Sequence, residues 1–280
     1  MKIYEREITS IESLFSAIKD LDKIVDHQIW WRGQREYKWL LEPSAFRNSC
    51  EHDERARILR FQQRAISRHD NLPPLTDKPG WLFIMQHYRL PTRFLDWTES
   101  PLIALFFASE IYECHQMHPD VISDADGALF ALSPYLLNNN QLEKNGILMP
   151  EEPEVIEAMM PVFDVTAKGI KKVIAIRPSE VDVRLMGQLS VFTINGYRIA
   201  IDNLPSSDEF LWKFKVPKDA KKNIQKELQQ IGIRLSNIFP DLEHLSEEIR
   251  QKTFNPIVEP PSLGIGRYFN SQRRGIESST

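Results

Sequence analysis

Cysteine is scarce in this sequence, and no long apolar run is present. Cys50 and Cys114 are the two cysteines among 280 residues, and they form neither a CxxC pair nor a cluster with histidine. Structural zinc is therefore not expected, and so few thiols in a chain of this length suit a reducing compartment. The densest apolar stretch, Pro101–Ala108, is much shorter than the roughly 18 residues of a membrane span.

The amino-terminal residues and the overall charge indicate where the protein is located and which kinds of partner it can bind. Charged residues occupy positions 2, 5, 6 and 7, where a secretory signal would need an apolar run. We therefore expect a soluble cytoplasmic protein with no membrane partner. The formal net charge is −4 and the pI is near 6.0, which excludes a globally basic surface but is compatible with a local basic cleft.

Familiar catalytic motifs are also missing. The sequence contains no P-loop, GxSxG, HExxH or EF-hand loop, and no glycine-rich turn follows the first strand that we predict. Asp124 and Asp126 lie close together but are a poor basis for a metal site. A Ser/His/Asp triad is compatible with the sequence, although no nucleophile stands out.

Apolar periodicity predicts an α+β protein. Apolar residues at helical spacing predict helices at 10–18, 51–68, 81–87, 219–232 and 241–254. Apolar and alternating runs predict strands at 29–34, 127–132, 173–178, 184–194 and 210–216. Residues 136–155 are predicted to be a long loop, of the kind that serves as a lid or binding element. We expect one domain over residues 1–255, followed by a flexible tail over 256–280.

The stretch 86–108 concentrates chemically specific side chains between two helical patterns. Pro91 fixes its own φ and biases the preceding residue towards extended backbone, so residues 86–97 are predicted to be a stiff loop. Thr98 or Ser100 can cap the helix that Pro101 opens, and the residues that follow are apolar nearly all round. Polar groups held against such a buried helix form either a folding network or a binding site.

Two alternatives stay open for the charged residues of these segments. Arg93 and Asp96 can anchor the fold as a buried pair or can contact a ligand directly. The arginines of the charged helix at 51–68 most simply form a solvated face, with nucleic-acid contact as the alternative.

Several motifs, in one order, resemble the FRG domain family. The signature is Trp31-Arg32-Gly33, in which Trp stands where the family usually has Phe, and matching segments follow at 39–47, 86–98 and 238–242. The order of three polar elements is also similar to that of the ADP-ribosyltransferase superfamily. These elements are Arg32 on an early strand, Asp96-Trp97-Thr98 before the buried helix, and Gln188 before a later strand.

The resemblance to that superfamily implies a fold and a cofactor. The fold is a mixed or antiparallel β core, arranged as a split sheet and wrapped by several helices. The cofactor is NAD, with Arg32 at its phosphates, where the guanidinium fork suits bidentate contacts, and the segment containing Thr98 at its ribose. The implied cofactor-binding set is Arg32, Gln34, His87, Tyr88, Arg93, Trp97 and Thr98, and the implied catalytic set is Arg32, Asp96 and Gln188.

One position departs from the pattern. Gln188 occupies the place of a catalytic Glu, and a neutral amide can orient a ribose hydroxyl but cannot offer negative charge to a developing cation. Asp96 is the candidate for supplying that charge. The structural alternatives are an Arg32–Asp96 pair that holds the fold, Gln188 as a polar strand residue, and His87 as a core histidine.

Three functions follow from these patterns. The first is an enzyme that binds NAD as its nucleotide substrate and modifies a macromolecular acceptor, protein or nucleic acid, or hydrolyses NAD. The FRG resemblance implies a role for it as a bacterial toxin or anti-phage defence effector, and such an effector can have a neutralising partner. The second is a non-catalytic module that binds a nucleotide or a nucleic-acid end. The third is a structural interaction domain.

Overall fold

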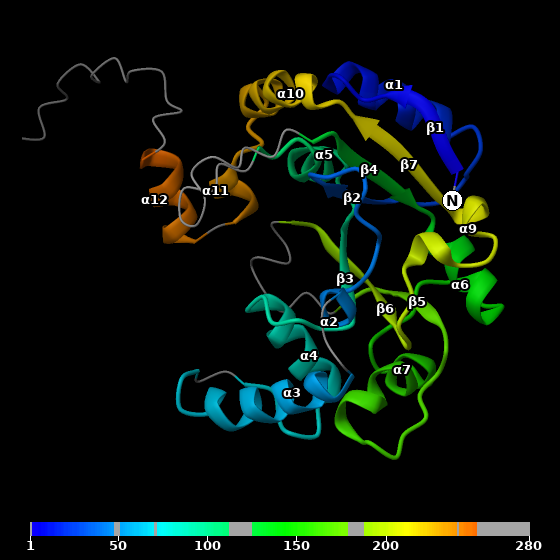
Figure 1. Ribbon diagram of the computed structural model, residues 1–280, viewed down its shortest axis with the longest axis vertical. Coiled ribbons are helices and arrows are strands. Elements are labelled where there is room, and N and C mark those ends of the chain that lie inside the picture. Colours follow the sequence, from blue (N-terminus) through cyan, green and yellow to red (C-terminus); the bar gives the residue numbers. More distant parts are fainter. Residues whose placement is uncertain are drawn as a thin grey trace, which may run out of the picture.

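The computed structural model of the chain describes residues 2–47, 51–69, 72–111, 125–178, 188–239 and 241–250. Within these residues, seven strands form one mixed sheet that is covered by helices (Figure 1), so the predicted α+β class is confirmed. The strands, in their order across the sheet, are β1 (Lys2–Glu7), β7 (Leu211–Val216), β4 (Gly127–Leu132), β2 (Trp30–Gln34), β3 (Phe94–Thr98), β6 (Ser190–Asn195) and β5 (Val173–Ile176).

Helices follow or connect most strands. They are α1 (Ile11–Leu21), α2 (Ser44–Arg47), α3 (Glu51–Ala65), α4 (Lys78–His87), α5 (Pro101–Ala108), α6 (Pro134–Leu142), α7 (Pro153–Phe163), the 3₁₀ helix η1 (Ile201–Asn203), α9 (Ser207–Phe210), α10 (Lys218–Gln230), α11 (Leu235–Ile238) and α12 (Leu242–Arg250). None of the helices in the described ranges combines the length and the apolarity needed to cross a membrane.

The sheet divides between β2 and β3. These strands share one antiparallel pair, Trp31 opposite Thr98, whereas β2 pairs with β4 and β3 pairs with β6 over five residues each. The first half-sheet (β1, β7, β4, β2) and the second half-sheet (β3, β6, β5) therefore diverge, as Figure 1 shows. This division agrees with the split sheet that the sequence resemblance implies.

Apolar side chains pack in three clusters around the two half-sheets. One face of the first half-sheet packs with α1, α5 and α10, where Trp31, Leu105 and Ile224 are buried together. Its other face contributes Trp30 and Phe130 to a second cluster. The third cluster joins α3, α4 and α7 to β5 and β6. The second cluster also contains Leu95 and Val191 of the second half-sheet, so it joins the two half-sheets on that face.

Helix α5 lies unusually close to the first half-sheet. A Cβ atom added to Gly33 of β2 would lie 1.9 Å from the backbone oxygen of Ala104, and one added to Gly127 of β4 would lie 2.1 Å from the backbone oxygen of Ala108. The absence of a side chain at both glycines permits this close approach of the helix backbone. Ser100 caps α5 by accepting a hydrogen bond from the Ile103 amide, and Pro101 opens the helix as predicted.

Two predictions about local structure are wrong. Residues 94–98, expected to belong to a stiff loop, form β3, because their backbone pairs with β6 over five residues. Residues 136–155, expected to be a loop, contain most of α6 and the start of α7, which Ser133 and two prolines at helix starts help to open. The predicted first helix is confirmed as α1, and the strand before it, β1, which was not predicted, pairs in parallel with β7.

Some predictions fall outside the described residues. These are the surroundings of Cys50, Cys114 and Asp124, and the predicted tail at 256–280. In the part of the chain that the structure describes, no group of three or more His, Cys, Asp or Glu residues could hold a metal ion.

Candidate functional site

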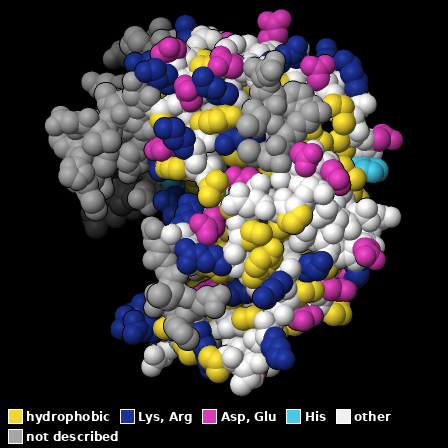
Figure 2. Space-filling view, turned by 45° about the vertical axis from the view of Figure 1, so that its right-hand side comes forward, with side chains coloured by type: hydrophobic (Ala, Val, Ile, Leu, Met, Phe, Trp, Pro, Cys, Tyr) yellow, Lys and Arg dark blue, Asp and Glu magenta, His cyan; other side chains and the backbone are white. Residues whose placement is uncertain are grey.

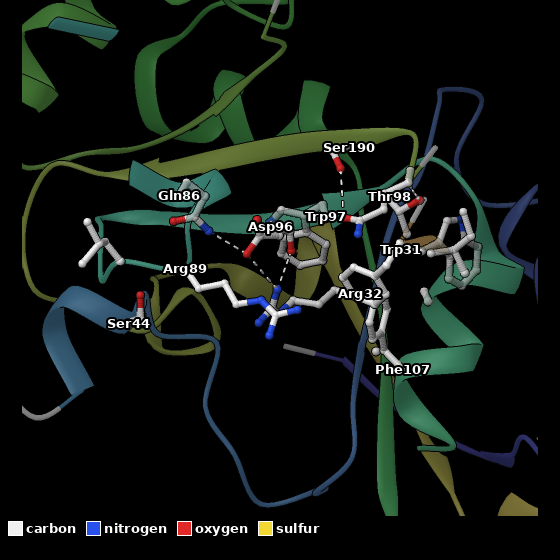
Figure 3. Close-up of a pocket in the computed structure, with 16 residues that line it drawn as sticks. Trp31, Arg32, Ser44, Gln86, Arg89, Asp96, Trp97, Thr98, Phe107 and Ser190 are labelled. Atoms are coloured by element: carbon white, nitrogen blue, oxygen red, sulfur yellow. Dashed lines mark hydrogen bonds and ion pairs between the residues drawn. The ribbon is translucent and has the colours of Figure 1, made fainter. Parts of the chain in front are cut away.

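A pocket with a volume of about 360 Å³ lies where β2 and β3 diverge. Its walls come from both half-sheets, from α5, and from the segments that follow α4 and α11 (Figure 3). The lining residues that carry polar side chains are Arg32, Ser44, Gln86, Arg89, Asp96, Thr98, Gln188 and Ser190. The loss of strand pairing beyond Trp31 and Thr98 therefore creates both the space and its polar lining.

Arg32 extends from the middle of β2 into this pocket. Its Nη1 donates to the backbone oxygen of Asp96 at 2.6 Å and lies 4.0 Å from Oδ2 of the Asp96 carboxylate. Among the described residues, its buried Nε has no hydrogen-bond acceptor. Burial lowers the pKa of Arg32 to about 10, so the guanidinium is still positively charged at neutral pH. The site thus contains a partly desolvated cation with several N–H donors available to a ligand.

Asp96 presents its carboxylate to the same pocket from β3. Its side chain is 55% exposed, and its Oδ2 accepts a hydrogen bond of 2.8 Å from Nε2 of Gln86. The Oε1 atom of Gln86 in turn accepts from the Thr92 hydroxyl. This chain of two hydrogen bonds fixes the orientation of Gln86 and, through it, of a carboxylate that solvent and ligands can reach.

A second polar group links β3 to β6. The Thr98 hydroxyl donates to the backbone oxygen of Gln188 at 2.7 Å and accepts from the Ser100 amide at 3.0 Å. The side-chain amide of Gln188 donates to the backbone oxygen of Ile238 at 3.2 Å. Gln188 therefore lines the pocket and also joins α11 to the turn just before β6.

Aromatic rings supply the apolar walls. Trp31, Trp97, Phe107 and Phe239 line the pocket. Trp97 is buried, and its indole N–H donates to the Thr193 hydroxyl at 3.1 Å, which fixes the plane of the ring. Rings of this kind can hold the apolar face of a base or another planar group.

Arg89 brings a second guanidinium to the pocket. Its backbone φ is +59°, a left-handed conformation that is uncommon for residues other than glycine, and it follows directly on the end of α4. The guanidinium carbon lies 5.7 Å from the Phe239 ring centre, and Nη2 lies 3.3 Å from Nε2 of His244. Figure 3 shows Arg32 and Arg89 pointing towards the same part of the pocket from different elements. Two cations and one carboxylate favour an anionic ligand.

The sequence of the strands and helices that build this pocket can be compared with known families. Residues 27–116 match the family model described as FRG domain. The predicted FRG resemblance is confirmed. No curated protein and no solved structure matches the chain.

The FRG segment carries only part of the pocket. It contains β2, β3 and α5, and with them Arg32, Gln86, Arg89 and Asp96. Gln188, Ser190 and Phe239 lie beyond the matched residues, so the later part of the chain completes the pocket.

The structure brings five of the sequence-predicted site residues into the pocket. They are Arg32, Asp96, Trp97, Thr98 and Gln188. Gln34, the last residue of β2 in the FRG segment, is buried outside the pocket lining and donates to the backbone oxygen of Leu40. His87 and Tyr88 are also outside the lining; their rings contact each other with centres 4.8 Å apart.

Arg93 does not reach the pocket and does not pair with Asp96. It is buried, and its Nε and Nη2 donate to the two carboxylate oxygens of Glu54 at 3.1 and 2.8 Å. Its Nη1 donates to the backbone oxygen of Ala158 at 2.6 Å. The alternative in which Arg93 pairs with Asp96 is wrong, because positions three residues apart along an extended segment face opposite ways. Arg93 instead joins the segment just before β3 to α3 and α7 as a structural anchor.

Sequence reasoning missed several residues of the pocket. Gln86 and Ser44 belong to the segments that resemble the FRG family, and their position there was an available signal. Arg89 interrupts the same segment and carries a charge, but its left-handed backbone has no clear sequence marker. Phe107, Ser190 and Phe239 reach the pocket only through tertiary packing.

Proposed function

We propose that the chain binds NAD in the pocket at the β2–β3 division and transfers its ADP-ribosyl group to a macromolecular acceptor or to water. The observation that carries this proposal is the meeting of a guanidinium, Arg32, and an exposed carboxylate, Asp96, on the wall of one open, aromatic-lined pocket. The FRG match is compatible with this function but names no activity.

Arg32 and Arg89 are the groups that would hold the pyrophosphate. A guanidinium can donate two parallel hydrogen bonds to phosphate oxygens, and partial burial of Arg32 strengthens such a contact because little water competes. The half-buried ring of Phe107 offers apolar surface to a base or to the nicotinamide. The ligand would thus be bound by charge at its centre and by apolar contact at its ends.

Asp96 would act on the ribose. When the bond between C1′ of the ribose and the nicotinamide nitrogen breaks, the electron pair leaves with nicotinamide and positive charge develops on the sugar. The Asp96 carboxylate, oriented by Gln86, can stabilise that charge. A nucleophile of the acceptor, or water, then bonds to C1′ and loses its proton. Gln188 can only orient a hydroxyl, because its amide carries no charge.

Two substitutions separate binding from chemistry. Arg32→Lys keeps the positive charge but loses the fork, so calorimetric titration with NAD is expected to show roughly tenfold weaker binding. Asp96→Asn keeps the shape of the side chain, so NAD affinity should change little while nicotinamide release, measured chromatographically, falls by about 100-fold. Arg198→Lys is the matched control, because Arg198 pairs with Glu42 at 3.5 Å and does not line the pocket.

The same measurements can refute the proposal. Wild-type affinity in Arg32→Lys together with wild-type nicotinamide release in Asp96→Asn would exclude these residues as the site. A non-catalytic nucleotide-binding module is the second candidate, favoured by the neutral Gln188 at the position of a catalytic Glu. That module would bind NAD without releasing nicotinamide, even at high protein concentration and long incubation.

The proposed cellular setting is a bacterial toxin or anti-phage defence effector acting in the cytoplasm. It rests on the FRG resemblance, since the geometry of the pocket bears on the ligand and not on the cellular role.

A further inference from the structure

Arginines are concentrated in α3 and in the turn after it. Residues 55–69 contain five arginines and no Asp or Glu, although the whole chain has a net charge of −4. The nearest acidic residue before them in α3, Glu54, is buried and bound by Arg93, so its charge does not face this surface. A local concentration of positive charge therefore lies on one part of an otherwise acidic protein.

Three of these arginines form a regular row. Arg60, Arg64 and Arg68 are exposed and follow one another at intervals of four residues. Arg60 and Arg64 lie on one side of α3 about 6 Å apart, and Arg68 follows in the turn after the helix. No ion pair joins any of the three to another described residue, and Nη1 of Arg68 donates to the Arg64 backbone oxygen at 2.7 Å. We call these three residues the arginine ridge. Figure 2 shows dark blue side chains in the lower part of the molecule, at the level of α3, as well as in its upper part, with magenta side chains among them.

Exposed aromatic groups lie between the ridge and the pocket. Tyr88 is 51% exposed, and its ring centre lies 6.4 Å from that of Phe61 and 6.3 Å from that of His69. The next residue, Arg89, lines the pocket. The surface thus continues from the cations of α3, across an exposed ring, to the guanidinium at the pocket.

We propose that the arginine ridge and Tyr88 dock single-stranded nucleic acid, and that this strand is the acceptor presented to the pocket. The part of the inference that concerns the acceptor rests on the proposed ADP-ribosyl transfer; the docking does not. Guanidinium groups bind phosphates bidentately, and an exposed aromatic ring next to a cationic row suits stacking of an unpaired base. An acidic protein would satisfy the charges but has no unpaired base to stack on the exposed ring of Tyr88.

The test measures docking in the absence of NAD. Fluorescence anisotropy would follow the binding of labelled single-stranded RNA and DNA of about 15 nucleotides to the full chain, over salt concentrations from about 50 to 200 mM. We expect the triple variant Arg60→Gln, Arg64→Gln and Arg68→Gln to bind at least tenfold more weakly at low salt. The magnitude of its salt slope should fall by about 2, since each phosphate contact on a single strand contributes about 0.7. Tyr88→Ala should weaken binding without changing that slope.

The chain offers a matched control on α10. Lys218, Lys222 and Lys226 are exposed at the same four-residue spacing, so replacing all three by Gln removes the same charge from another face. This control is expected to bind the oligonucleotides nearly as tightly as the wild type. NAD titration of the ridge variant should be unchanged, which separates failure of docking from failure of the proposed function.

Three outcomes would overturn the inference. One is equal weakening of oligonucleotide binding by the α3 and α10 triple variants, which would indicate a non-specific charge effect. Another is no measurable binding of either oligonucleotide at the lowest salt concentration. The third is tighter binding of polyglutamate than of both oligonucleotides, which would assign the ridge to an acidic protein. A preference for RNA or for DNA would support the inference and identify the kind of strand.

Discussion

Arg93→Met is expected to lower the free energy of unfolding by about 3–5 kcal/mol. Arg93 and Glu54 are both nearly inaccessible to solvent and form two hydrogen bonds with each other, and Arg93 also binds the Ala158 backbone oxygen. Methionine fills much of the same space but leaves a buried carboxylate and a buried carbonyl without their donor. Urea unfolding followed by the fluorescence of the six tryptophans would measure the loss.

An exposed ion pair of the same chain provides the control for this measurement. Arg198 lies 3.5 Å from Glu42, and its side chain is largely exposed, so Arg198→Met should cost less than about 1 kcal/mol. The double variant Arg93→Met with Glu54→Leu should recover part of the loss, because it removes both buried charges. Equal destabilisation by Arg93→Met and Arg198→Met would contradict the anchoring role of Arg93.

Gly33→Ala is expected to destabilise the protein by about 3 kcal/mol or more, or to prevent its recovery in folded form. The added Cβ would lie 1.9 Å from the Ala104 backbone oxygen and 2.5 Å from the Ala108 backbone nitrogen. Because both atoms belong to the backbone of α5, no side-chain rotation relieves the clash, and the helix must move away from β2. Thermal unfolding followed by circular dichroism would measure the change.

Two other glycines test this explanation. Gly127→Ala should have a comparable effect, since its added Cβ would lie 2.1 Å from the Ala108 backbone oxygen. Gly146→Ala should change stability by no more than about 0.5 kcal/mol, because no atom outside its immediate neighbourhood lies within 4 Å of the added Cβ. The explanation fails if all three variants have similar stability.

The substitutions Arg93→Met and Gly33→Ala both change the packing of elements that shape the pocket. Gly33 follows Arg32 directly and sets the distance between β2 and α5, and both of these elements contribute to the pocket wall. Arg93 lies in the loop that leads into β3 and binds α3, the helix that carries the arginine ridge. Packing around these two residues therefore positions the proposed binding surfaces as well as stabilising the fold.

The sequence predicted the elements whose signals are local. The aromatic run that ends near Gly33 predicted the strand β2. Ser100 as a helix cap, Pro101 and the apolar residues after it predicted the helix α5. The sequence also brought Arg32 and Asp96 together as candidates, through an order of polar elements that is similar to that of the ADP-ribosyltransferase superfamily. In contrast, Pro91 indicated a loop for residues that pair as β3, because strand pairing with β6 involves residues almost a hundred positions later.

The sequence by itself determined where α5 begins and which arginines follow one another at intervals of four residues in α3 and just after it. Only the tertiary structure decided that Arg93 binds Glu54, that β2 and β3 separate after one pair, and that Arg89 and Phe239 meet at the pocket. The physical reason is range: caps, turns and periodicity act between neighbours in the chain, whereas ion-pair partners and strand divergence depend on how distant elements pack.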